Sequence, residues 1–184
     1  MIYPIYIYGS SSLRQEAQDV PKDYPGLREL VADMFASMYE ANGVGLAAPQ
    51  IGKPLRMFTV DVSSYADEEP GLADFRKVFI NPEIYWYGDD EVVMGEGCLS
   101  LPGLNEDVCR PEQIRIRYVD EDFNEHDELL AGFSARVVQH EYDHLDGVLF
   151  TDHLSPLRKT LIRSKLSSMG KGKYSASYKT KQTK

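Results

Sequence analysis

Hydrophobic side chains recur every three or four positions in three stretches of the chain, which is the spacing of an amphipathic helix. The first stretch, residues 25–43, has a proline near its start and a glycine after its end, the usual boundary signals. The second, GFSARVVQHEYDHLDG, ends at Gly147. The third begins with Ser155 as its cap and Pro156 in its first turn. We therefore expect a long N-terminal helix, a central helix and a C-terminal helix.

Strand-like stretches separate these helices. The N-terminal MIYPIYIYG is apolar but short, and without a basic leader or cleavage site it reads as a strand rather than a signal peptide. QIRIRYVDEDFNEHDELLA predicts a hairpin, because apolar and polar residues alternate on both sides of a turn. Further strands are expected at residues 55–62, 78–87 and 91–98. The fold class is therefore α+β, with mostly antiparallel strands packed around a central helix.

The length and composition are those of one globular domain. The chain has 184 residues, of which 42% are hydrophobic and 27% charged. We expect a single domain over residues 1–169 and a basic, disordered tail over residues 170–184. No stretch is long and apolar enough to span a membrane. Two cysteines are too few for a secreted disulfide scaffold, which favours a cytoplasmic location.

Charge is distributed unevenly along the chain. Residues 158–184 contain nine lysines and arginines and no acidic residue, whereas the other 157 residues carry 11 basic and 29 acidic side chains. The acidic body should repel nucleic acid, and the basic end should be attracted to polyanions. The acidic segment 63–76 contains a Pro-Gly turn and is expected to be a solvated loop.

The stretch QHEYDH, residues 139–144, has the composition of a metal site. On a helix at about 100° per residue, His140 and His144 lie within about 40° of each other, so their rings leave the same face. Glu141 lies about 60° from His144 on the same wheel. This is the H-E-x-x-H arrangement, which provides two metal ligands and one acid–base group. Phe133 and Val137 share the face with the histidines.

The third ligand decides the class of the site. One protease family has a third histidine six residues after the second, but this chain has Phe150 there, which binds no metal. His153 is read as a surface or capping residue and His126 as a solvated turn residue. Cys98 remains, in the glycine-flanked stretch GEGCLSLPG, where it could also be a core residue. A Cys-His-His site leaves a fourth position open, which marks a catalytic rather than a structural metal.

Three blocks in this order, GVGLAAPQIG (43–52), EGCLS (96–100) and QHEYDHLDG (139–147), resemble the signature motifs of peptide deformylases. The likeness extends over about residues 1–165. The positions that match the motifs are Gly45, Gln50, Cys98, Leu99, His140, Glu141 and His144. The resemblance covers the expected domain, which would then be a catalytic domain. The second cysteine, Cys109, has no such context and is read as structural.

The resemblance implies removal of the formyl group from newly made proteins that begin with formyl-methionine, with release of formate. Cys98, His140 and His144 would hold one divalent metal, and Glu141 would serve as general base and then general acid. The Leu99 backbone N–H and the Gln50 side-chain amide would stabilise the oxyanion, each by roughly 3–4 kcal/mol. The ligand types alone suggest zinc. The resemblance implies Fe(II) as the native ion, with zinc, nickel or cobalt also able to bind.

Several residues are candidates for contacts with the substrate. Phe133 and Val137 on the ligand face, with Val44, would form an apolar wall that suits a methionine side chain, although a core role is equally open. Gly45 and Gly97 would let a backbone approach closely. Two arginines are further candidates for a place near the substrate. Arg110 could hydrogen-bond the incoming peptide or lie in a surface salt bridge, and Arg136 is expected at the pocket rim.

Other functions remain open at this stage. The basic C-terminal end could hold the enzyme near ribosomal RNA, or it could be a solubilising tail. H-E-x-x-H also suggests a metalloendopeptidase, which the missing third histidine argues against. A non-enzymatic, metal-stabilised binding module has no need of Glu141 beside an open coordination position. A membrane partner is not expected.

Overall fold

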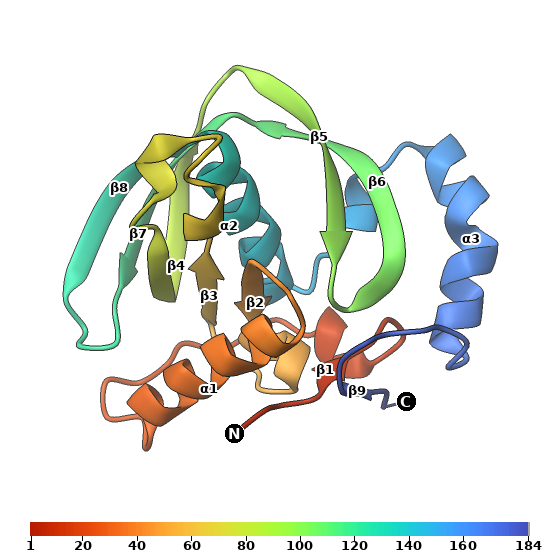
Figure 1. The fold of residues 1–184 in the computed structure, drawn as a ribbon, viewed down its shortest axis with the longest axis horizontal. Coiled ribbons are helices and arrows are strands. Elements are labelled where there is room, and N and C mark those ends of the chain that lie inside the picture. The colour runs from red at the N-terminus through yellow and green to blue at the C-terminus, as the bar shows by residue number, and fades with distance from the viewer. Residues whose placement is uncertain (184) are drawn as a thin grey trace.

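A five-stranded antiparallel sheet forms the centre of the fold in this computed structural model, which describes residues 1–183 (Figure 1). Its strands lie in the order β2-β3-β4-β7-β8. Their bounds are β2 (Gly45–Ala47), β3 (Met57–Asp61), β4 (Arg76–Tyr87), β7 (Gln113–Val119) and β8 (Glu125–Ala131). Alternation of apolar and polar residues in β7 places Ile114 and Ile116 in the core, as the sequence predicts.

Two helices cover this sheet. Helix α2 (Gly132–Leu145) packs against β2, β3, β7 and β8 and carries both histidines of the predicted site. Helix α1 (Leu27–Glu40) packs on β2 and β3 and buries Met34 and Met38 completely. Each such side chain contributes about 1.5–3 kcal/mol of hydrophobic stabilisation. The expected arrangement of antiparallel strands around a central helix is therefore confirmed.

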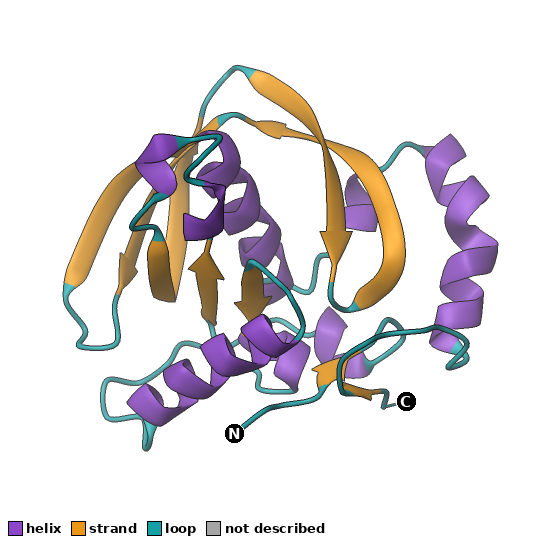
Figure 2. Cartoon of the chain, viewed as in Figure 1, coloured by secondary structure: helices purple, strands orange, loops and turns teal. Residues whose placement is uncertain are grey.

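A long hairpin stands beside α2 (Figure 2). It consists of β5 (Glu91–Cys98) and β6 (Leu101–Pro111), which pair from Glu91↔Pro111 to Cys98↔Leu101. The register shifts between Gly97 and Cys98, at the tip of the hairpin. The sequence reading gave no strand for residues 101–111. Alternating burial along β6, with Leu104, Glu106 and Val108 turned inward, shows the strand period that was missed.

The C-terminal residues differ from the expectation of a disordered tail. Helix α3 (Pro156–Gly170) begins as predicted, with the Ser155 side chain accepting a hydrogen bond from the Arg158 backbone N–H. The chain then turns back, and β9 (Thr180–Lys181) pairs in parallel with β1 (Ile5–Tyr6). The first and last strands of the chain therefore lie side by side, close to both termini (Figure 1).

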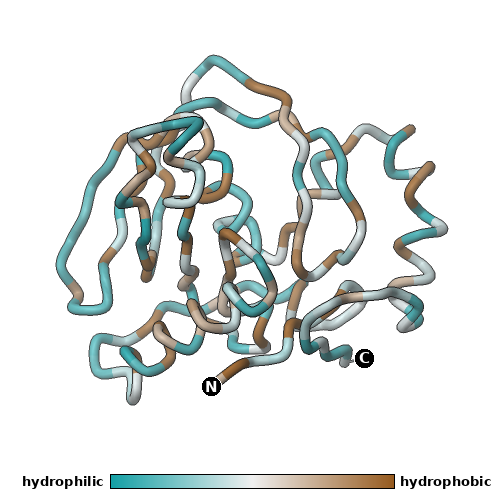
Figure 3. Tube along the Cα trace, in the orientation of Figure 1, coloured by the Kyte–Doolittle hydropathy of each residue, from teal (hydrophilic) through white to brown (hydrophobic). Residues whose placement is uncertain are grey.

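The acidic segment 63–76 is also less solvated than expected. It contains two short 3-10 helices, Ser63–Tyr65 and Pro70–Leu72, and it buries Leu72 and Phe75 in the main core. Figure 3 shows that hydrophobic and hydrophilic positions alternate along the exposed helix α3. Among residues 1–183, no helix combines the length and hydrophobicity that crossing a membrane requires.

Candidate metal centre and active site

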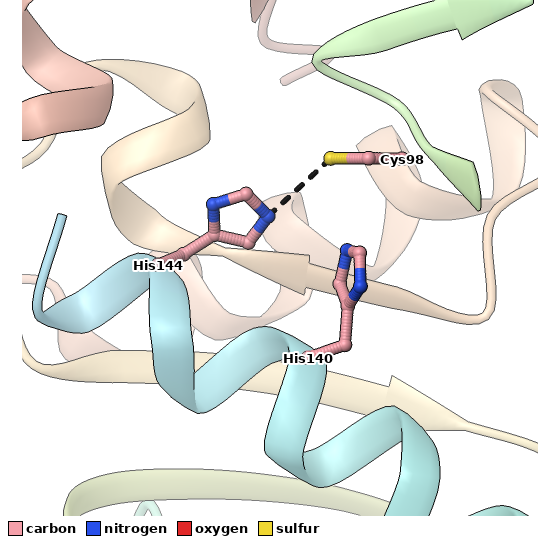
Figure 4. A group of neighbouring side chains, drawn as sticks. All are labelled: Cys98, His140 and His144. Carbon is pink, nitrogen blue, oxygen red and sulfur yellow. Dashed lines mark hydrogen bonds between the residues drawn. The ribbon is translucent and has the colours of Figure 1, made fainter. Parts of the chain in front are cut away.

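Cys98, His140 and His144 come together as the sequence predicts. Their side-chain ligand atoms all lie within 4.8 Å of one another, and Cys98 Sγ is 3.4 Å from His144 Nε2 (Figure 4). The two histidines extend from one face of α2, one turn apart, while Cys98 reaches them from the end of β5. A tetrahedral cation with one sulfur and two nitrogen ligands separates the ligand atoms by roughly 3.3–3.8 Å. The cluster therefore fits a divalent metal.

The two histidines are prepared differently for ligation. His140 Nδ1 lies 2.8 Å from Glu96 Oε1, which fixes Nδ1–H toward the carboxylate and leaves Nε2 for a metal. His144 is buried, and burial lowers its pKa well below the usual value, which favours the neutral form that binds metals. Its Nδ1 has no hydrogen-bond partner within residues 1–183.

Glu96 is the centre of a buried charge network behind His140. The carboxylate accepts two hydrogen bonds from Arg110, at 2.7 and 3.0 Å, and one from Arg136 at 2.7 Å. Burial raises the pKa of Glu96, but hydrogen bonds from His140 and Arg110 outweigh burial and hold it well below the ordinary range. This charged network holds His140 in place from the side away from Cys98.

Glu141 is the opposite kind of carboxylate. Only 4% of it is exposed, and Oε2 has no hydrogen-bond partner among the described residues. Burial raises the pKa of Glu141 to about 7; His140 opposes this shift, whereas Glu96 adds to it. A Cβ atom on Gly45 would lie 2.8 Å from Glu141 Cγ, so the glycine is required for the carboxylate to pack against β2. A carboxyl that titrates near neutral pH is suited to proton transfer.

The two residues predicted to stabilise an oxyanion also lie at the cluster. Gln50 Oε1 accepts a hydrogen bond from the Ala47 backbone N–H at 2.8 Å, which orients the amide. Its Nε2 therefore faces Ser100 Oγ at 3.2 Å and Cys98 Sγ at 3.5 Å. Leu99 follows Cys98 directly, and its carbonyl accepts a hydrogen bond from Tyr178 Oη at 2.6 Å. One donor, Gln50 Nε2, thus lies beside the thiol, and Leu99 is the next residue in the chain.

A cavity of about 690 Å³ opens onto this cluster. Residues predicted to contact the substrate line it, namely Val44, Gly45, Gly97, Phe133 and Val137. Tyr65 of the acidic segment also lines it and packs on Phe133, with ring centroids 4.6 Å apart. Residues 175–178 near the C-terminus form a further part of the wall.

One of the two arginines lies away from the cavity, and the other lines it, as expected. Arg110 is 4% exposed and does not line the cavity, because its guanidinium lies between Glu96 and Asp143, 2.9 Å from the latter. The predicted contact with the peptide is therefore wrong, and the salt bridge is buried rather than on the surface. Arg136 does line the cavity, but its guanidinium hydrogen-bonds Glu96 and the carbonyls of Val92 and Val108.

The remaining histidines are not part of the cluster, as expected, but His126 lies half-buried in strand β8 rather than in a solvated turn. His153 Nε2 is 2.7 Å from Asp143 Oδ2, and His126 Nε2 is 2.8 Å from Asp120 Oδ2. Phe150, in the place of a third histidine, is buried and stacks on the His140 ring with centroids 5.9 Å apart. Cys109, read as structural, is exposed, and its thiol lies 3.3 Å from Glu91 Oε2.

Two residues that contribute to the site were not identified from the sequence. Glu96 lies two positions before Cys98 in β5, inside the block EGCLS that supplies the cysteine. The sequence therefore contains a signal for Glu96 in its position beside the cysteine. Tyr178 lies 79 residues from Leu99 along the chain, and no local pattern indicates their contact.

Comparison with known proteins agrees with this geometry. A sequence model of the family described as polypeptide deformylase matches residues 2–160. The chain belongs to this family. The peptide deformylase of Christiangramia forsetii is 50% identical over 186 residues, which cover 97% of this chain and 95% of that protein. The peptide deformylase of Cytophaga hutchinsonii is 50% identical over 181 residues, covering 98% and 97%.

Solved structures of peptide deformylases share the fold. That from Thermus thermophilus is 42% identical, with a TM-score of 0.82, and covers 94% of this chain and 99% of its own. That from Legionella pneumophila is 37% identical, with a TM-score of 0.80, and covers 93% and 96%. This deformylase is therefore a metal-dependent hydrolase that removes the N-formyl group from newly made polypeptides.

Proposed function

We propose that this deformylase acts on N-terminal formyl-methionine through one divalent metal held by Cys98, His140 and His144. The observation that carries the proposal is the position of Glu141 beside a three-residue cluster that opens onto the cavity. Glu141 is a buried carboxyl whose Oε2 has no hydrogen-bond partner among residues 1–183. Three ligands leave one coordination position free, which is the property of a catalytic site.

The residues around the cluster suit hydrolysis of a formamide bond. When bound, the metal lowers the pKa of water and so supplies a nucleophile near neutral pH. Glu141 is placed to take a proton from the water that attacks the formyl carbon and to deliver it to the amine as the C–N bond breaks, for which its raised pKa is suitable. Gln50 Nε2 and the Leu99 N–H donate hydrogen bonds to the formyl oxygen as negative charge develops on it. Formate and a free amino terminus are the products.

The cavity wall suits a methionine side chain. Val44, Phe133 and Val137 give it an apolar lining next to the cluster, and an unbranched thioether adapts to such a surface. At Gly97, a Cβ atom would lie 2.6 Å from Asn105 Oδ1, so a larger residue there would displace the Asn105 side chain. The substrate backbone would then approach the cluster along the Gly45 and Gly97 edges.

We propose Fe(II) as the native metal, with zinc, nickel or cobalt able to replace it. Fe(II) beside the Cys98 thiolate is open to oxidation, and oxidation of the thiol removes a ligand. Protein purified in air should lose activity within hours, while protein loaded with nickel or cobalt should keep it. Metal analysis by mass spectrometry, run in parallel with activity, checks this expectation. Equal, lasting activity of iron-loaded protein in air would contradict it.

The deciding experiment is formate release from formyl-Met-Ala-Ser by protein purified without oxygen and with its metal retained. Release by the wild type is expected, together with a fall of about 10²–10³-fold in kcat for Gln50→Leu, because one oxyanion donor is removed. A Gln113→Leu variant makes the same change in β7, away from the cavity wall, and serves as the control. Absence of formate release from protein with one metal per chain would overturn the proposal.

We further propose that the enzyme works in the cytoplasm and contacts ribosomal RNA through α3. The helix exposes basic residues and also Leu157 and Leu161, which are 69% and 62% exposed. Reversal of two exposed charges, Lys159→Glu with Arg163→Glu, should weaken co-sedimentation with ribosomes and reduce its salt dependence. Lys22→Glu, an exposed charge reversal elsewhere, is the control. Unchanged co-sedimentation of the α3 variant would contradict this contact.

A further inference from the structure

The C-terminal arm, defined as residues 174–183, runs from the end of α3 past the tip of the β5–β6 hairpin to β1 (Figure 1). Exposure alternates along its first part. Tyr174, Ala176 and Tyr178 are half-buried, and Ser175 and Ser177 are exposed. This period of two is the pattern of an extended chain with one side on the protein.

The arm is held on the C-terminal side of the stretch that lines the cavity and within that stretch. On the C-terminal side, the Ile5 backbone N–H donates to the Lys179 carbonyl at 2.9 Å, and Gln182 Nε2 donates to the Tyr8 carbonyl at 2.7 Å. Within the stretch, Tyr178 Oη donates to the Leu99 carbonyl at 2.6 Å. The arm is therefore fixed next to the residue that follows the metal ligand Cys98.

The backbone of residues 175–178 is free. None of its N–H or C=O groups makes a hydrogen bond with another of residues 1–183. These residues line the same cavity as Cys98 and Glu141, and three of their side chains are small. A backbone with unused donors and acceptors beside a cavity can pair with the backbone of a bound peptide, even though residues 177 and 178 form a bend.

Resting on the proposed function, we propose that residues 175–178 bind the backbone of the substrate after its formylated methionine. The occupant is an extended peptide, because the cavity is continuous from the metal cluster to the arm. Small side chains at 175–177 leave the backbone accessible and impose little choice on the side chains of the substrate. The arm thus contributes affinity for peptide length rather than for sequence.

The test compares two substrates, formyl-methionine amide and formyl-Met-Ala-Ser, in each variant. The ratio of their kcat/KM values measures what the longer peptide gains from binding. Deletion of residues 174–184 should lower this ratio by about tenfold, mainly through KM of the longer substrate, because about two hydrogen bonds are lost. Tyr178→Phe, which releases the arm from Leu99, should lower the ratio by about twofold to fivefold.

Tyr174→Phe is the matched control, because its hydroxyl bonds Thr180 within the arm and Tyr174 does not line the catalytic cavity. Its ratio should equal that of the wild type. An unchanged ratio in the deletion and in Tyr178→Phe would overturn the proposal. An equal loss on both substrates would do the same, since it indicates only structural support.

A second measurement needs neither activity nor a variant. Hydrogen exchange of the intact, metal-loaded enzyme is followed with and without the peptide Met-Ala-Ser. Slower exchange of the amides at 175–178 with the peptide is expected, and no change there would count against peptide binding. This measurement also decides the matter where the deletion fails to fold. If the wild type releases formate from neither substrate, the proposed function fails. If the wild type releases formate rapidly but the kcat/KM ratio is the same in all variants, only the role proposed for the arm is rejected.

Discussion

The two sides of His140 hold two glutamates that are almost equally buried and yet chemically opposite. Glu96 and Glu141 are 6% and 4% exposed. Behind the ring, Glu96 meets two guanidinium groups and an imidazole, and its pKa is held well below the ordinary range. In front, Glu141 faces the cavity without a partner at Oε2, and burial raises its pKa to about 7.

The difference shows that burial alone does not decide the charge of a carboxyl group. Desolvation favours the neutral form of both glutamates, and the neighbouring hydrogen-bond donors and charges separate them. The charged one orients a metal ligand, which a fixed negative charge does well. The one without partners remains able to exchange a proton, which is what a general base requires. His140 on α2 thus has a charged, structural glutamate on one side and a reactive glutamate on the other.

The sharpest way to test this comparison is Glu141→Gln. We expect kcat to fall by about 10²–10⁴-fold, because the group that moves the proton is removed. The free energy of unfolding should stay the same or rise, since a buried carboxyl without a partner is replaced by a neutral amide. Formate release and urea unfolding of the metal-loaded protein measure the two quantities. If Glu141→Gln lowered the free energy of unfolding and left kcat unchanged, Glu141 would have the structural role that is assigned to Glu96.

Glu96→Gln should give the opposite pattern. Arg136 and Arg110 would lose a buried counter-charge, which lowers the free energy of unfolding by about 3–5 kcal/mol. Metal affinity should fall by about 10–100-fold, because His140 is no longer oriented by a carboxylate. Competition with a metal chelator and urea unfolding provide the measurements. Asp127→Asn, at an exposed pair with Arg117, is the control and should change stability by less than about 1 kcal/mol.

Glu128 provides an intermediate case with a smaller expected effect. Its carboxylate bonds Lys77 at 2.7 Å and Tyr118 at 2.6 Å, at the edge of the core. Burial raises its pKa, but the hydrogen bonds from Lys77 and Tyr118 prevail and lower it from 4.5. Because the folded pKa is depressed, the stabilisation is present above about pH 4.5 and is lost as the pH falls through the folded value.

Glu128→Gln should therefore lower the free energy of unfolding by about 0.5–1.5 kcal/mol at pH 7. The difference from the wild type should shrink as the pH falls below 4.5, where the carboxylate of the wild type becomes protonated. Thermal unfolding at a series of pH values follows this difference. A constant difference across the series would show that the charge of Glu128 is not what stabilises this edge.

The sequence was most informative where chemistry restricts both residue type and spacing. His140, Glu141 and His144 follow one helical face, and Cys98 was the remaining sulfur ligand in a glycine-flanked turn. Strand β6 was missed, because LPG at its start reads as a turn. Arg110 was placed at the substrate, since nothing local reveals that it bonds Glu96, 14 residues away, and Asp143, 33 residues away.

The C-terminal residues were misread for a different reason. Their polar, basic composition suggested disorder, whereas the alternation of Tyr174, Ala176, Tyr178 and Thr180 with serine and lysine is a strand pattern. In this segment the composition predicts disorder and the periodicity predicts a strand, and the structure agrees with the periodicity. The partner strand β1 begins at Ile5, at the other end of the sequence, so only the folded structure shows what the pattern pairs with.

The pairing of β9 with β1 has a consequence for the protein while it is being synthesised. Helix α2 and its histidines are synthesised before residues 174–183, because synthesis runs from the N-terminus. Residues 180 and 181 are added after helix α2, and they must return to Ile5 and Tyr6 before the arm is in place. A copy in which residues 174–183 have not yet been added therefore has its cysteine and histidine cluster but lacks the part of the cavity wall that residues 175–178 form.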